Sequence, residues 1–164
     1  MDLKQIFERQ DKAIWLRLIG FFLGFQWFMA GIEKLLDPNF AGALPKTLVF
    51  FASQNPYSWM AGLINNYFIP QAGIFAVLVS WGETLGGLAL MLGMLTNLAL
   101  LGLIFLNSVF FLAAGWTSPS TLGLNLLMGF LEAVLLLSSG SKYLSLDEII
   151  ISKFPKLKRF LLPI

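Results

Sequence analysis

The chain has 164 residues, of which 57% are apolar and only 12% are charged, and its mean hydropathy is +0.78. This composition excludes an ordinary soluble domain and predicts an integral membrane protein. Cysteine and histidine are both absent, which excludes thiol redox chemistry, thiolate- or imidazole-ligated metals and any catalytic triad that needs an imidazole base. We therefore predict no metal site and no covalently bound cofactor.

The charges are concentrated at the two ends of the sequence. Between Thr47 and Ser141 the only charged residues are Glu83 and Glu132. A helix needs about 20 mainly apolar residues to cross about 30 Å of hydrocarbon, and within lipid only closed backbone hydrogen bonding is stable. Four segments meet this requirement, at about residues 14–36, 71–92, 96–115 and 122–139.

Four crossings return the chain to its starting side, so both termini are expected on one side of the membrane. The other side carries only two basic residues, Lys34 and Lys46. The positive-inside rule therefore places both termini in the cytoplasm. The basic residues on the terminal side are Lys4, Arg9, Lys12, Arg17, Lys142, Lys153, Lys156, Lys158 and Arg159.

The last three spans are joined by short connections at 93–96 and 116–121, which predicts antiparallel neighbours. We predict an all-α integral membrane protein, an antiparallel four-helix bundle forming a single domain over residues 1–164. The link over 37–70 is longer, and we predict two short interfacial helices in it, one near 44–52 and one with Asn55 as N-cap and Pro56 in its first turn. Its aromatic residues Trp59, Tyr57, Tyr67 and Phe68 suit the headgroup zone. The link is then either an external plug without a ligand or a lid over a site.

Both ends of the chain have the pattern of surface helices. Leu3, Ile6, Phe7 and Ile14 fall at helical spacing, and the amphipathic tail over 145–164 begins with a capping box from Ser145 to Glu148. The basic residues Lys156, Lys158 and Arg159 would meet anionic lipid. This run is too short, and too close to apolar residues, to indicate nucleic-acid binding.

Each predicted span carries one strongly polar side chain near mid-depth. At 1.5 Å of rise per residue, Gln26, Glu83, Asn107 and Glu132 all lie roughly 15–18 Å from a membrane boundary. Such residues face the bundle interior, and no basic residue is expected in the core to neutralise the two acids. We therefore expect at least one acid to be protonated at neutral pH. Candidate hydrogen-bond partners are Gln26, Asn107, Asn125, Ser80 and Thr84.

This polar layer has two interpretations. In one, the side chains only hydrogen-bond one another and hold the helices together. In the other, they line a pocket for a polar headgroup such as a quinone, with Trp27 and Trp81 as apolar walls. The candidate pocket residues are Gln26, Trp27, Trp81, Glu83, Asn107, Asn125 and Glu132.

Three segments in the expected order resemble the DoxX/DoxD family. Trp15-Leu16-Arg17 followed by Gly31-Ile32-Glu33-Lys34-Leu35 resembles its first helix, with an Arg at the start and Gly-x-x-Lys-Leu at the end. The run 83–96 is similar to its acidic, Gly-Gly second helix, and 140–147 to its closing segment, with Lys142 in place of the usual Arg. The family-motif positions are Arg17, Lys34, Glu83, Gly86 and Gly87.

The resemblance implies a four-helix protein of a bacterial inner membrane, in some members a subunit of thiosulfate:quinone oxidoreductase. At most, then, the chain is a subunit of an enzyme, with sulfur chemistry in a partner or a bound organic cofactor. In the leading hypothesis it binds quinone and anchors a redox partner. Glu83 would relay a proton, Gln26 and Asn107 would hydrogen-bond the quinone, and Arg17 would face lipid phosphate.

Two alternatives remain open. One is a ligand-free structural or assembly protein of the lipid bilayer, which is consistent with the missing redox groups. The other is a small solute or proton carrier, because paired intramembrane carboxyls also mark proton relays. Besides lipid, the partners considered are a redox subunit and a second copy of the chain.

Overall fold

The computed structural model describes residues 3–138 and 145–154, with side chains from Ala13 onward. Every element in these ranges is a helix, in agreement with the predicted all-α class. In chain order the elements are α1 (Leu3–Leu36), α2 (Phe40–Ser53), α3 (Ser58–Leu63), the π-helical segment η1 (Ile64–Phe68), α4 (Ala72–Leu92), α5 (Thr96–Ala114), the 3-10 turn η2 (Gly115–Thr117), α6 (Pro119–Leu137) and α7 (Leu146–Lys153).

Four helices are long and apolar enough to cross a membrane: Ala13–Leu36 within α1, Ala72–Leu92, Thr96–Thr117 and Pro119–Leu137. They match the four predicted spans to within three residues at each end. The N-terminal segment differs from the prediction, because it continues α1 without a break and does not form a separate surface helix. No proline interrupts α1, so nothing in its sequence forces the helix to stop before the span.

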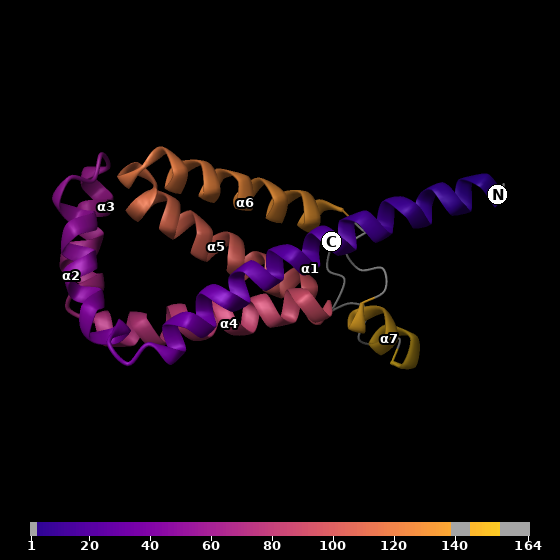
Figure 1. The fold of residues 1–164 in the computed structure, drawn as a ribbon, viewed down its shortest axis with the longest axis horizontal. Helices are drawn as coiled ribbons and strands as arrows, with labels where there is room; N and C mark the ends of the chain where they lie inside the picture. Colours follow the sequence, from indigo (N-terminus) through magenta and orange to yellow (C-terminus); the bar gives the residue numbers. More distant parts are fainter. Residues whose placement is uncertain (1–2, 139–144, 155–164) are drawn as a thin grey trace.

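The four long helices form a bundle (Figure 1). Helix α1 packs most extensively against α4, α5 lies between α4 and α6, and α6 contacts α1. Small residues set the closest approach. A Cβ atom added to Gly24 would lie 2.7 Å from the carbonyl oxygen of Gly87, and one added to Gly87 would lie 2.6 Å from that of Gly24. Only glycine at these two positions lets the backbones of α1 and α4 come this close.

The link between α1 and α4 is helical, as predicted, and α2 runs across the end of the bundle (Figure 1). We call this end the α2 end and the opposite one the α7 end. The predicted N-cap is wrong by two residues, because the second helix begins after Tyr57. Asn55 instead accepts the amide hydrogen of Tyr57 at 3.0 Å in a local turn and donates to the carbonyl oxygens of Leu112 and Ala113 at 3.1 Å. The Asn55 side chain thus ties the link to α5.

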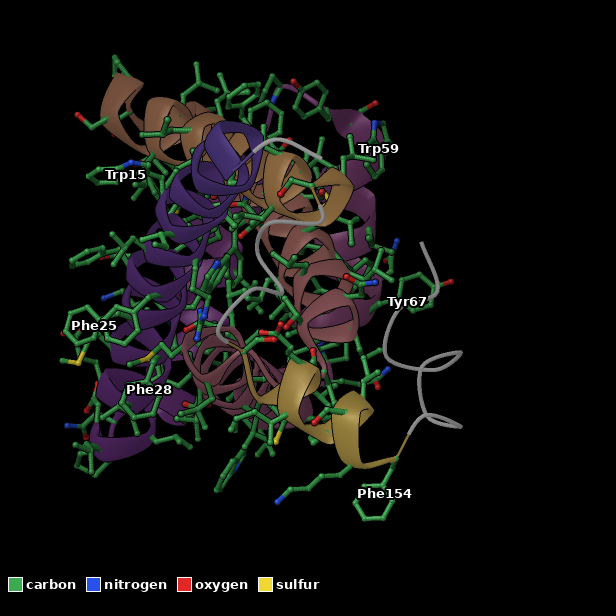
Figure 2. The ribbon with its side chains drawn as sticks, turned by 90° about the vertical axis from the view of Figure 1, so that its right-hand side faces the viewer. Trp15, Phe25, Phe28, Trp59, Tyr67 and Phe154 are labelled. Atoms are coloured by element: carbon green, nitrogen blue, oxygen red, sulfur yellow. The ribbon has the colours of Figure 1, made fainter. Side chains whose placement is uncertain are left out.

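Two apolar clusters fill the interior. One lies between the long helices, and the other lies where the link helices meet the bundle. The outer surface is also apolar: Trp15 and Phe25 point away from α1 on its free side (Figure 2). Exposed apolar side chains of this kind suit acyl chains. The first cluster consists of Leu23, Trp27, Leu90, Leu100, Leu103, Met128 and Leu135, and the second of Leu48, Met60, Ile64, Ala72 and Ala113.

Helix α7 begins as the capping-box pattern predicts, with the Ser145 hydroxyl accepting the amide hydrogen of Glu148 at 3.2 Å. The helix lies at the α7 end of the bundle, and Phe154 at its far end points away from the other helices (Figure 2). The rest of the predicted amphipathic tail, with Lys156, Lys158 and Arg159, lies outside the described residues, as does Lys142.

Candidate functional site

An ion pair joins α1 to α4 inside the bundle. Lys34 Nζ lies 2.6 Å from Glu83 Oε2 and donates a second hydrogen bond to the carbonyl oxygen of Ala30, at 3.2 Å. The Glu83 side chain is 1% exposed and that of Lys34 is 28% exposed. The expectation that no basic residue reaches the mid-span acids is therefore wrong for Glu83. Helical side chains tilt toward the helix N-terminus, so Lys34, near the C-terminal end of α1, points back into the bundle.

The second acid has a different kind of partner. Glu132 of α6 is fully buried, and its Oε1 accepts a hydrogen bond of 2.7 Å from Trp27 Nε1 of α1. Trp27 is also buried, and its ring lies 6.0 Å from that of Phe110, centroid to centroid. Glu132 Oε2 has no hydrogen-bond partner within the described part of the chain. Among the described residues, one indole N–H therefore holds this carboxyl group in place.

The two acids have different hydrogen-bond partners. Glu83 is bonded to Lys34 and Glu132 to Trp27, and both partners lie on α1. The acids also come from α4 and α6, which lie on opposite sides of the bundle with α1 and α5 between them. The residues of the predicted polar layer thus belong to separate hydrogen-bonded groups.

A groove between α5 and α6 contains the third polar group. The groove has a volume of about 500 Å³, and apolar side chains form most of its lining. In its lining, Asn107 Nδ2 donates to the carbonyl oxygen of Asn125 at 2.8 Å. Asn107 is 4% exposed, and its Oδ1 has no hydrogen-bond partner among the described residues. The lining includes Asn107, Ser108, Phe111, Asn125, Gly129 and Phe130.

Two of the predicted pocket residues point away from the interior. Trp81 is 49% exposed and Gln26 is also exposed, so neither can line an interior pocket in this structure. The reason is that depth along a helix does not specify the direction of a side chain around it. The inward face of α1 runs through Gly24, Trp27, Gly31 and Lys34, at the i, i+3, i+7 spacing of one helix face.

The family-motif residue Arg17 has a structural role. Its guanidinium donates hydrogen bonds to the carbonyl oxygen of Leu90, at 3.1 Å, and to that of Met91. These carbonyls end α4, where the helix dipole is negative and the carbonyl groups have no partner within the helix. The expectation that Arg17 faces lipid phosphate is therefore wrong, because α4 supplies the acceptors. Helix α4 then stops at Gly93, which has a φ of 65°.

A buried aspartate joins α7 to the start of α5 at the α7 end of the bundle. Asp147 of α7 is fully buried, and its carboxylate accepts hydrogen bonds from the amides of Leu95 and Thr96, at 2.7 and 2.8 Å, and from the Thr96 hydroxyl at 2.8 Å. The Asp147 amide donates to the carbonyl oxygen of Gly93 at 2.9 Å. We call this set of contacts the Asp147 clasp. It caps the first turn of α5. This role of Asp147 was not predicted from the sequence, although the residue closes the third family motif.

The remaining motif glycines also serve packing. Gly87 meets α1, as described above, and a Cβ atom added to Gly86 would lie 2.8 Å from Leu103 of α5. These two positions thus let α4 approach a neighbour on each side. No group of three or more acidic side chains converges in the described ranges, so the geometry offers no cluster of metal ligands there.

The fold and these buried polar groups define a small helical membrane protein with a hydrogen-bonded interior and a lateral groove. The chain belongs to the DoxD family, described as the TQO small subunit DoxD, whose model matches residues 15–163. Neither a curated protein nor a solved structure matches the chain. The match agrees with the resemblance found from the three motifs.

Proposed function

We propose that this protein is a DoxD-type membrane subunit that binds the ring of a quinone in the α5–α6 groove and anchors a redox partner. The observation that carries the proposal is the Asn107 side chain in the lining of the groove. An unpartnered buried oxygen is uncommon in proteins, and a buried polar group in an otherwise apolar pocket is the usual arrangement for orienting a small ligand.

The walls and the entrance suit the same ligand. Phe111 and Phe130 line the groove, and Phe130 is 66% exposed, so the groove is open on a surface of apolar side chains. A quinone that diffuses within the bilayer could enter the groove with its ring while its isoprenoid tail stays among acyl chains. Of the pocket candidates, Asn107 and Asn125 line this groove, whereas Glu83 does not line it and is bonded to Lys34.

The amino-acid composition is the reason for proposing a redox partner. The chain has no cysteine and no histidine, so none of its side chains can form a disulfide or ligate a haem iron through imidazole. Electrons for a bound quinone would therefore come from another subunit. The protein's own contribution would be binding, orientation and exclusion of water from the ring.

The test is a titration of a short-tailed ubiquinone or menaquinone analogue into the purified protein in lipid nanodiscs. We expect saturable binding that Asn107→Leu weakens and that Gln26→Leu leaves unchanged, because Gln26 is polar, mid-span and exposed on α1, which does not line the groove. Absence of saturable binding, or equal weakening by both substitutions, would contradict the proposal.

A ligand-free assembly protein is the second candidate, and the Asp147 clasp favours it. Arg17 bonds the end of α4 and Asp147 bonds the start of α5, so these two charged residues hold helices together at the α7 end. Deletion of residues 149–164 separates the two functions. If a partner complex then dissociates while Asn107→Leu has no effect on activity, the scaffold function is supported and quinone binding is not.

A further inference from the structure

The Asp147 clasp fixes the height of α7 relative to the membrane spans. It bonds Asp147 to Gly93, Leu95 and Thr96, where α4 is connected to α5. Helices α4 and α5 are both long and apolar enough to cross a membrane, so the connection between them turns at a membrane boundary. Helix α7 therefore starts at that boundary, beside the end of α4 (Figure 1).

One side of α7 carries exposed apolar side chains together with a basic residue. Leu146, Ile149 and Lys153 follow the i, i+3, i+7 spacing of one helix face. All three are exposed, Leu146 by 36% and Ile149 by 52%. We call these three residues the Ile149 flank. The flank begins directly before Asp147, whose carboxylate bonds the amide of Leu95, and Leu95 is itself 43% exposed. The flank therefore continues the apolar surface of the spans.

The other two sides of α7 differ from this flank. Asp147 is fully buried and marks the side that is held to the bundle. Glu148 and Ser152 are one turn apart, exposed and polar. At 3.6 residues per turn, Ser152 lies about 120° around the helix from Leu146. An apolar side with a basic residue, next to a polar side, is the pattern of a helix that lies in the plane of a membrane surface.

We infer that the Ile149 flank is a lipid-binding surface and that α7 lies along the membrane boundary. Leu146 and Ile149 enter the upper part of the acyl chains, and Ser152 faces water. The stem of Lys153 lies along the apolar side while its ammonium group binds headgroup phosphate, the opposite charge at that level. The inference does not depend on the α5–α6 groove, so it stands or falls separately from quinone binding.

The test measures the surroundings of two positions on α7. The chain has no cysteine, so Leu146→Cys and Ser152→Cys each accept one nitroxide label without any other substitution. The labelled proteins are placed in nanodiscs of phosphatidylcholine and phosphatidylglycerol. Electron paramagnetic resonance then measures collisions with oxygen, which concentrates among acyl chains, and with a neutral nickel chelate, which stays in water. We expect the oxygen-to-nickel ratio to be several-fold higher for Leu146→Cys than for Ser152→Cys.

A charge reversal tests the contact with phosphate. Lys153→Glu, added to labelled Leu146→Cys, should lower the oxygen-to-nickel ratio because headgroup phosphates repel a carboxylate and lift the helix toward water. Lys46→Glu is the matched control, since Lys46 is an exposed basic residue on α2, at the other end of the bundle. It should leave the ratio at position 146 unchanged. An unchanged ratio in Lys153→Glu would overturn the assignment of phosphate to this residue.

The pattern of the two ratios decides what covers the flank. Ready access of the nickel chelate to both labels would place α7 in water and overturn the inference. Poor access of both reagents to Leu146→Cys would show that a protein surface covers the flank, which would also overturn the assignment to lipid. A higher ratio at Ser152→Cys would mean that the helix faces the membrane with its polar side, and the inference would again be wrong.

Discussion

Removal of the Asp147 carboxylate should detach α7 and loosen the start of α5. In Asp147→Ala, the amides of Leu95 and Thr96 lose acceptors at 2.7 and 2.8 Å, and the Thr96 hydroxyl loses a third bond. The hydroxyl can rotate to another acceptor, but the two amides cannot. These bonds are charge-assisted, since Asp147 accepts as a carboxylate.

The expected loss follows from those two amides. A hydrogen bond to a charged group contributes a net 1.5–3 kcal/mol, so the two together give a loss of about 3 kcal/mol at the lower figure. For a chain of this size that lowers the melting temperature by about 6–12 °C. Asp147→Asn keeps one acceptor oxygen and should lose about half as much, whereas Ser152→Ala on the exposed side of α7 should be close to neutral.

Two measurements check this prediction. Thermal unfolding in detergent gives the melting temperatures of the three variants. Hydrogen exchange of residues 93–97 and 146–153 tests the location of the effect, because the amides of Leu95 and Thr96 should become unprotected in Asp147→Ala. Unchanged exchange at these amides, or a melting temperature equal to that of Ser152→Ala, would show that the clasp does not hold α7 to the bundle.

Three further substitutions test the interior. Lys34→Met should destabilise the protein by about 3–5 kcal/mol because it leaves Glu83 buried without its cation; steric-trap unfolding should show partial recovery in the double variant with Glu83→Gln. Trp27→Phe should cost about 1–3 kcal/mol, read by the same assay, because the acid of α6 loses its one described donor. Gly87→Ala should lower the melting temperature strongly by pushing α1 from α4, while Gly102→Ala, with open space around it, should not.

The element positions could be predicted from the sequence because they depend on one-dimensional patterns. The length of apolar runs set the four spans, and the Ser145 to Glu148 pattern set the start of α7. The cap at Asn55 was mispredicted for a physical reason. Its side chain reaches across to the carbonyl oxygens of Leu112 and Ala113, and a contact between residues 57 or more apart in sequence leaves no local signal.

The direction in which polar side chains point was harder to predict from the sequence. Gln26 and Trp27 were both predicted to line the pocket, yet the 100° between consecutive helical residues exposes Gln26 and buries Trp27. The spacing of small residues could have predicted the inward face of α1, since Gly20, Gly24 and Gly31 lie on its packed face. Lys34 was placed at the boundary because its Cα lies there, whereas its ammonium group lies beside Glu83.

The family motifs and the groove occupy different halves of the bundle. Arg17, Lys34, Glu83 and Gly87 all lie in the contact between α1 and α4 or at its end. The groove lies between α5 and α6, and none of these motif residues lines it. Substitutions in the α1–α4 contact should therefore lower the stability of the protein. They should affect ligand binding only as a consequence of that lower stability. Asn107→Leu should instead alter ligand binding at the groove while the α1–α4 contact stays intact.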